Sequence, residues 1–338
     1  MSESDYIIAI CQRDNPVVKF KCSGKGKPMG QRQELDQRAG AMMLVLCAIW
    51  GMQQVAMKAA APDIAPVLQV ALRSGIAALM VCVLMLARGE RIVPRDGTWR
   101  PGLLVGLLFA LEFLLVSEGL QYTSASHMVM FLYTAPIFAA LGLHWKVPAE
   151  RLKPAQWLGI AIAFSGIIAA FAGRTQGQVQ AGAPNVLLGD LFGVAAAMAW
   201  GATTVVVRCS SLATAPVART LLYQLVGAFV LLTLVTLALG RTEFTLTPVS
   251  MTSMLYQTFL VSFASFLAWF WLLRHYLASR LGVLSFMAPM FGIGFGVWLL
   301  GEPLERNFIV GALLVMLGIL LVSGHEWLMQ MVRRRRNA

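Results

Sequence analysis

Charged residues are scarce in this sequence, and the common enzyme motifs are missing. Asp, Glu, Lys and Arg together make up 13% of the 338 residues, against about 25% in an average soluble domain. There is no GxSxG motif and no HExxH motif, because His325-Glu326 lacks the second histidine. The absence of a GxxxxGK[ST] phosphate loop means that any transport would be driven by an ion gradient or by the solute's own gradient.

The cysteines are too scattered to form a framework. They stand at Cys11, Cys22, Cys47, Cys82 and Cys209, and no CxxC pair occurs. Disulfide scaffolds and zinc sites both need regular cysteine spacings. We therefore expect reduced thiols, with neither a metal site nor a cofactor.

Long hydrophobic runs dominate what is present. Hydrophobic residues make up 58% of the chain, in runs of about twenty, the length at which a helix crosses roughly 30 Å of hydrocarbon. The runs predict spans near residues 40–60, 66–87, 103–121, 125–145, 156–173, 189–207, 216–239, 253–276, 280–300 and 307–325. The sequence therefore predicts an all-α polytopic membrane protein with ten transmembrane helices.

The sequence repeats itself with an offset of 150 to 153 residues. The matching positions are Trp50-Gly51 with Trp200-Gly201, Ala125-Ser126 with Ala278-Ser279, Pro136 with Pro289, and Glu150, Leu152, Gly159, Gly166 with Glu302, Leu304, Gly311, Gly318. Each copy contains an odd number of predicted spans, so the second copy must cross the membrane in the opposite sense. This predicts two inverted five-helix repeats, residues 39–174 and 188–325, joined by a periplasmic linker at 175–187.

The distribution of basic residues predicts the orientation. If the N-terminus is cytoplasmic, 22 of the 27 Lys and Arg residues fall in cytoplasmic segments and three in outer loops, as the positive-inside rule requires. Both termini are then cytoplasmic, residues 1–38 as a disordered extension and 326–338 as a basic tail. Met29 leaves a later start open. We interpret the net charge of +11 as a topology signal and expect no nucleic-acid partner.

Few ionisable residues fall inside the predicted spans, where each needs a partner or a function. They are Arg73, Glu112, Glu118 and His127. Glu112 lies about nine residues from either end of its span, some 14 Å deep at about 1.5 Å per residue. Arg73 lies at a similar depth, so an ion pair is allowed. Such a pair could exchange protons or bind a zwitterion, with the arginine holding the carboxylate; the alternative is a permanent structural pair.

Other polar and aromatic residues are candidates for a cavity lining. Gln53, Gln54 and Trp50 lie in the first span, where cavity lining and helix–helix hydrogen bonding are both open interpretations. His127 could relay protons or only cap a helix, and Tyr122 is a further lining candidate. Trp269, Trp271 and Tyr276 in the eighth span could stack on an organic substrate, but aromatic residues near membrane interfaces are usually anchors, and we favour that interpretation. Lys58, Arg208, Arg274 and Arg280 lie near helix ends, where their side chains can snorkel.

Two prolines occupy matching positions of the two copies. Pro136 and Pro289 each remove a backbone hydrogen bond and bend the helix, and a pair of such hinges suits alternating access. Gly282, Gly292, Gly294 and Gly296 in the ninth span allow close backbone approach, through packing within the chain or through a homodimer face.

These motifs together resemble the drug/metabolite transporter superfamily, in its ten-helix EamA branch. The resemblance covers residues 40 to 325 and rests on Trp50-Gly51, Leu72-Arg73, Tyr122-Thr123-Ser124-Ala125-Ser126, Pro136, Pro289, and Gly301-Glu302-Pro303-Leu304 followed by Gly311 and Gly318. It implies a bacterial inner-membrane transporter of small metabolites with a central cavity. Members handle amino acids, sugars, nucleotide precursors and drugs, so it implies no particular solute. The tail 1–38 is longer than usual, and Glu112 does not transfer from the family at large.

The sequence as a whole predicts a secondary transporter that exports an amino acid or similar polar metabolite by alternating access, with proton exchange an open option. A membrane-embedded enzyme acting on a lipid or isoprenoid is one alternative, but no cluster of acid or nucleophile residues supports it. A non-transporting scaffold is the other, and it would leave Glu112 dispensable. The expected partners are a small-molecule solute and membrane lipids.

Overall fold

The computed structural model describes residues 37–90, 92, 97–147, 151–171, 185–276, 281 and 284–336, all within the unit Gln33–Ala338. Within these ranges the backbone is helical, and the one pairing of extended backbone is an isolated bridge between Ile64 and Phe244. Most of the N-terminal extension, the linker and the second-copy pair Ala278-Ser279 lie outside the described residues.

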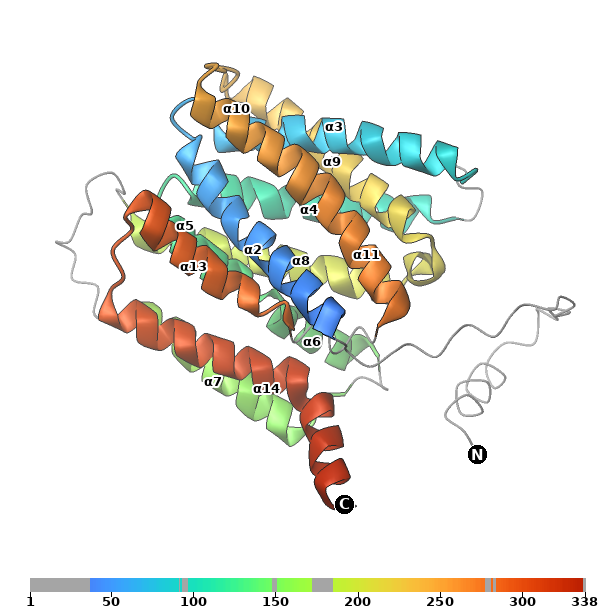
Figure 1. Cartoon of the computed structure of the whole chain (residues 1–338), viewed down its shortest axis with the longest axis vertical. Coiled ribbons are helices and arrows are strands. Elements are labelled where there is room, and N and C mark those ends of the chain that lie inside the picture. Colours follow the sequence, from blue (N-terminus) through green and yellow to red (C-terminus); the bar gives the residue numbers. More distant parts are fainter. Residues whose placement is uncertain are drawn as a thin grey trace, which may run out of the picture. The chain divides into compact units, whose positions relative to one another are not determined.

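The helices follow the predicted spans closely (Figure 1). The first copy contains α2 (Gln37–Ala59), α3 (Pro66–Ala87), α4 (Trp99–Gly119), α5 (Ala125–Leu132), α6 (Ala135–Lys146) and α7 (Pro154–Phe171). The second contains α8 (Val186–Arg208), the short η2 (Ser211–Thr214), α9 (Val217–Ala238), α10 (Pro248–Leu255), the π-helix η3 (Tyr256–Ser265), α11 (Phe266–His275), α13 (Met287–Leu300) and α14 (Arg306–Arg336). The last helix continues through most of the segment expected as a basic tail.

Length and composition make these helices membrane spans. Among the described residues, seven helical stretches of 21 to 23 residues are long and apolar enough to cross a bilayer; two of them, Ala125–Lys146 and Pro248–Trp269, join consecutive helices of the list above. Shorter apolar helices lie at Pro154–Ala170, Met287–Leu300 and Arg306–Val322. Leu79, Val83 and Leu86 on α3 are 63% to 68% exposed, which is costly in water but favourable against lipid. The prediction of an all-α polytopic membrane protein is confirmed, and the count of ten spans stays a prediction.

The two copies pack on each other in equivalent ways. A Cβ atom on Gly51 would lie 2.6 Å from the Ala288 carbonyl, and one on Gly201 would lie 3.1 Å from the Ala135 carbonyl. Glycine is required at both places because a side chain would collide with the facing backbone. The doubled Trp-Gly motif therefore marks the contacts of α2 with α13 and of α8 with α6.

The pair α7 and α14 runs side by side through a second set of glycines (Figure 1). Added Cβ atoms on Gly159 and Gly166 would meet the carbonyls of Gly318 and Gly311 at 2.8 and 2.7 Å. Each contact joins one copy to the other, so the glycines repeated in the sequence bring the two backbones together.

Both predicted hinge prolines follow an interruption of a helix. Tyr133 and Thr134 separate α5 from α6, and Pro136 lies in the first turn of α6. Ser285 and Phe286 form a turn before α13, whose first turn contains Pro289. A proline is tolerated in a first turn because its missing N–H has no partner there.

We name the two ends of the helical bundle by one residue each. At the Arg208 end lie the C-termini of α6 and α8 and the N-termini of α4 and α9. At the Glu302 end, Glu302 contacts the N-terminus of α5, and Asp63 contacts Thr247.

Candidate functional site

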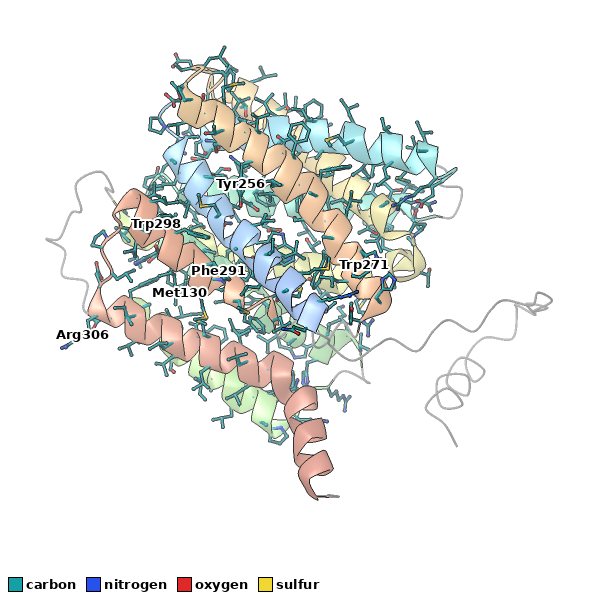
Figure 2. The ribbon with its side chains drawn as sticks, viewed as in Figure 1. Met130, Tyr256, Trp271, Phe291, Trp298 and Arg306 are labelled. Carbon is teal, nitrogen blue, oxygen red and sulfur yellow. The ribbon has the colours of Figure 1, made fainter. Side chains whose placement is uncertain are left out.

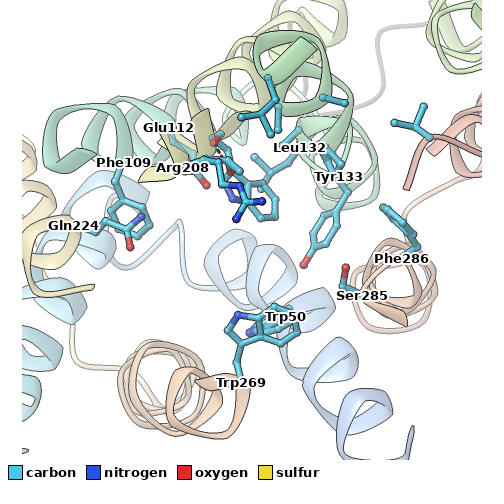
Figure 3. Close-up of a pocket in the computed structure, with 18 of the residues that line it drawn as sticks. Trp50, Phe109, Glu112, Leu132, Tyr133, Arg208, Gln224, Trp269, Ser285 and Phe286 are labelled. Atoms are coloured by element: carbon cyan, nitrogen blue, oxygen red, sulfur yellow. Dashed lines mark hydrogen bonds between the residues drawn. The ribbon is translucent and has the colours of Figure 1, made fainter. Parts of the chain in front are cut away.

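A cavity of about 930 Å³ lies among helices of both copies (Figure 3). Its lining draws on α2, α4, α5, α6, α7, α8, α9, α11 and α14, and on the turn before α13. It runs from the buried Glu112 to the exposed side chains of Arg151, Lys153 and Arg208. Among the described residues, none that lines it belongs to the Glu302 end, so we infer that the cavity opens toward the Arg208 end.

Glu112 stands at the deep part of the cavity with an acceptor atom unused. Its side chain is 5% exposed, and its Oε2 has no hydrogen-bond partner among the described residues. Phe109 and Phe113, three residues before and one after it on α4, also line the cavity, and their rings meet edge to face at 4.8 Å. Burying a carboxylate oxygen without a hydrogen bond costs free energy, unless a bound molecule or water donates one to it.

Gln54 repeats this arrangement on α2. It is 2% exposed, lines the cavity, and its Oε1 has no partner in the described part of the chain. Two residues of the cavity wall, on two helices, therefore each carry a buried acceptor without a described partner.

Arg73 lies behind the cavity wall and is held by amides. Its Nη1 donates to Gln257 Oε1 at 3.1 Å. When the Gln53 amide is oriented with its oxygen toward Arg73, both Nη atoms also donate to that oxygen at 3.2 Å. Gln257 in turn donates to Gln69 Oε1 at 2.8 Å and to Ser253 Oγ at 2.9 Å. The π-helix η3 thus brings Gln257 to the guanidinium, consistent with the frequent placement of π-turns at functional sites.

The ion pair allowed by depth is not formed directly. Glu112 and Arg73 interact electrostatically, but no contact within 4.0 Å joins them among the described ion pairs. The Arg73 guanidinium lies over the Phe113 ring, 4.6 Å from its centroid, and Phe113 lines the cavity while Arg73 does not. Arg73 therefore packs against the Phe113 ring and does not pair directly with Glu112.

Aromatic side chains form much of the remaining wall. Trp50 and Trp269 meet edge to face at 5.5 Å, and the Trp50 Nε1 donates to Ser265 Oγ at 3.0 Å. Tyr133 and Trp200 form a second such pair at 5.5 Å. Trp269 lines the cavity, because α11 turns this face toward α2; this fits the less favoured of our two interpretations, stacking on a substrate, better than that of an interface anchor. Trp271 is 46% exposed and lies on the outside of α11 (Figure 2).

At the Glu302 end, by contrast, two half-buried charged side chains are hydrogen-bonded. Glu302 accepts from the backbone N–H groups of Ala125 and Ser126 at 2.6 and 2.9 Å and from Ser126 Oγ at 2.5 Å. This places a carboxylate of the second copy on the N-terminus of α5, where the helix dipole favours it. Lys58 donates to the carbonyls of Leu120 and Thr123 at 2.5 and 2.6 Å, rather than only snorkelling.

Asp190 is a buried carboxylate that our sequence analysis missed. It is 0% exposed, accepts from Thr123 Oγ1 at 2.6 Å, and lies 3.1 Å from His127 Nδ1. The His127 ring also stacks on Phe308, with centroids 4.0 Å apart. The available signal was an Asp near the start of a span, which we did not count among the intramembrane charges.

The structure thus divides the predicted site residues. Trp50, Gln53, Gln54 and Glu112 line one cavity, and Arg73 stands just behind it. His127 and Tyr122 lie outside the lining at the Glu302 end, where the Tyr122 ring approaches Phe192 at 6.2 Å. Among the described residues, no group of three His, Cys, Asp or Glu side chains is arranged to hold a metal ion.

Comparisons with known proteins agree on one family. The model of the EamA-like transporter family matches residues 38–172 and again 187–324. A Bacillus subtilis protein named "Uncharacterized transporter YoaV" is 26% identical over 276 residues, 81% of this chain and 92% of its own length. An Escherichia coli protein named "Probable amino-acid metabolite efflux pump" is 26% identical over 304 residues, 87% of this chain and 97% of its own.

A solved structure titled "Crystal structure of protein" has the same fold. It superposes with a TM-score of 0.60 at 19% identity, covering 86% of this chain and 96% of that one.

Proposed function

The chain belongs to the EamA-like transporter family, and from this premise we propose that it exports small amine-bearing metabolites by alternating access. Family membership and transporter-named relatives identify a transporter of the drug/metabolite superfamily rather than an enzyme. Its solute is a small molecule, and its surroundings are the lipids of the bacterial inner membrane. The direction, solute class and mechanism below are our proposal.

For the topology we propose ten spans in two inverted repeats, 39–174 and 188–325, with both termini cytoplasmic. The reciprocal contacts of Gly51 with Ala288 and of Gly201 with Ala135 support this symmetry. The positive-inside rule then makes the Arg208 end cytoplasmic. A homodimer stays a prediction: Gly292 and Gly296 pack within the chain, whereas an added Cβ at Gly294 would meet nothing within 4 Å.

The single observation that carries the proposal is the cavity of about 930 Å³, whose described lining includes exposed residues at the Arg208 end and none at the Glu302 end. A transporter of this kind needs a site that faces one side of the membrane at a time. The described conformation fits an inward-facing state that is ready to accept solute from the cytoplasm. Closing the Arg208 end and opening the Glu302 end would bend α5 against α6 at Tyr133–Thr134, beside Pro136, and the equivalent turn beside Pro289.

For the solute we propose an amino-acid-like metabolite whose ammonium group binds Glu112. Two relatives carry names of amino-acid metabolite efflux pumps, and Glu112 presents an unused buried acceptor. A proton and an ammonium group would compete for the same carboxylate, so exchange of one for the other follows from a single residue. Arg73, held by Gln53 and Gln257, balances the charge from behind Phe113.

The test is solute flux from proteoliposomes loaded with a mixed metabolite pool. We expect Glu112→Gln to lower flux about 10- to 100-fold, since a hydrogen bond to a charged group contributes roughly 1.5–3 kcal/mol. Glu118→Gln is the matched control on the same helix, because Glu118 pairs with Arg241 outside the cavity. Unchanged flux in Glu112→Gln would remove this site, and no flux of any solute by the wild type would remove the transport proposal.

A further inference from the structure

Hydrogen-bond acceptors without a described partner lie at the deep part of the cavity, and no described ion pair joins them to a cation. Resting on the proposed function, we infer that this site recognises the ammonium group of an amine with an apolar body, and that it disfavours a free carboxylate on the solute. An amino acid whose carboxylate is masked as an amide or ester, or an amine without one, would be carried in preference to the zwitterion.

The first step is the chemistry of the unused atoms. Glu112 Oε2 and Gln54 Oε1 are both acceptors, both buried, and both without a partner in the described structure. An acceptor is completed only by a donor, and an ammonium group brings three N–H donors in one small head. A carboxylate brings only further acceptors, and it would meet the like charge of Glu112.

The second step is the state of the donors nearby. The Arg73 Nη1 donates to Gln257 and Gln53, Nη2 donates to Gln53, and Nε has no partner among the described residues. The guanidinium lies over the Phe113 ring, and Phe113 lines the cavity while Arg73 does not. The Trp50 Nε1 donates to Ser265. The Arg73 guanidinium that our sequence analysis expected to hold a solute carboxylate is therefore not part of the cavity wall, and the indole N–H of Trp50 is already engaged.

The third step is the distance to the cations at the cavity mouth. α4 and α8 run antiparallel, with Gly119 against Gly189. At about 1.5 Å per residue, the Arg208 backbone then lies roughly 18 Å from the level of Glu112. The ammonium and carboxylate of an α-amino acid are attached to one carbon, so an amino acid whose ammonium group binds Glu112 meets Arg208 only where that side chain extends inward from the mouth. Arg151 and Lys153 are exposed at the same mouth.

The fourth step is the wall around the acceptors. Trp50, Phe109, Tyr133, Trp200 and Trp269 surround this part of the cavity, as Figure 3 shows for all but Trp200. Ring faces attract an ammonium group and bury an apolar body. A carboxylate placed against them would lose its water without gaining donors, which is strongly unfavourable.

The experiment compares two matched solute pools in proteoliposomes made from the full chain. One vesicle set contains a mixture of natural amino acids, and the other contains the corresponding amino-acid amides at about pH 6, below the α-amino pKa of roughly 7.7–8.0. Efflux is measured by mass spectrometry, and leakage from protein-free vesicles is subtracted. We expect the amides to leave at least about 10-fold faster, a difference of roughly 1.4 kcal/mol.

Two variants separate recognition from folding. Glu112→Gln should abolish the preference for the amides, and Glu118→Gln on the same helix should retain it. Amino acids that leave as fast as their amides would overturn the inference while leaving the proposed transport intact. A preference that persists in Glu112→Gln would also overturn it, and the absence of protein-dependent efflux from either pool would overturn the proposed function itself.

Discussion

The Glu302 end and the central cavity bury carboxylates to the same degree but treat them differently. Asp190 is 0% exposed and Glu112 is 5% exposed. Asp190 has Thr123 and His127 as partners, and Glu302 accepts three hydrogen bonds at the N-terminus of α5. Glu112, in contrast, retains an oxygen without a described partner. Burial alone therefore does not distinguish a binding residue from a structural one; the state of its hydrogen bonds does.

The difference in hydrogen bonding also suggests a separate role for the Glu302 end and for the cavity. In the proposed cycle, polar contacts that cross between the two copies, such as Glu302 with Ser126 and Asp63 with Thr247, would hold the Glu302 end shut without help from a solute. Buried acceptors that face a cavity are costly until another molecule completes them. The polar groups at the Glu302 end have partners within the protein, whereas the acceptors beside the cavity have none among the described residues. This difference fits a conformation that is open on one side of the membrane only.

The strongest test of this comparison is chemical labelling of two matched serines. Ser285 lines the cavity, and Ser117 is 0% exposed on α4, between Glu112 and the Glu302 end. In a background without the native cysteines, we expect Ser285→Cys to react with a membrane-impermeant maleimide on the order of 100-fold faster than Ser117→Cys, because burial requires local opening first. Equal reaction at the two positions would contradict a cavity open at one end only.

A second test weakens the closed end. Glu302→Gln removes the charge from three hydrogen bonds, each worth roughly 1.5–3 kcal/mol when charged. We expect labelling of Ser117→Cys from the Glu302 side to rise about 10-fold, the change that roughly 1.4 kcal/mol produces in an equilibrium. Glu243→Gln, which alters an exposed carboxylate near that end, should change nothing. The comparison fails if both variants behave alike.

A third test addresses the passage between the two states. Pro136→Ala combined with Pro289→Ala should slow solute flux several-fold, because the turns before α6 and α13 would extend into continuous helix. The melting temperature should stay level or rise, since neither proline makes a hydrogen bond that is lost. A fall in flux together with a fall in melting temperature would indicate misfolding instead of slower switching.

The smallest effect is expected where a charge pair is half in water. Glu118 and Arg241 lie 2.6 Å apart with side chains 21% and 36% exposed, and such pairs contribute about 0–1 kcal/mol. Arg241→Gln should therefore leave both labelling patterns unchanged and lower stability by no more than about 1 kcal/mol, measured by thermal unfolding in detergent. A larger loss would show that solvent-exposed pairs also help to close this end.

Part of the site was predictable from spacing and depth. The position of Glu112 in mid-span predicted burial, and Trp50, Gln53 and Gln54 were expected at a cavity and lie there. The prediction and the structure agree because a polar residue in the middle of a span is unfavourable against lipid and must contact protein or a water-filled space.

The rest depended on which helices are neighbours. Arg73 and Glu112 match in depth, but Phe113 stands between Arg73 and the cavity. Trp269 and Tyr133 face the cavity because α11 and the α5–α6 turn are rotated toward it. Spacing along one helix predicts a shared face, but it does not say what lies opposite that face.

By itself, the sequence determined that this chain is a membrane protein and that its two halves are repeats of one unit. The length of the hydrophobic runs and the repeated Trp-Gly and proline positions are properties of the chain alone. Only the tertiary structure decided that Asp190 and Glu302 are satisfied while Glu112 and Gln54 are not. Hydrogen bonding acts over about 3 Å between atoms far apart in the chain, so the assignment of partners emerges only when the helices are packed.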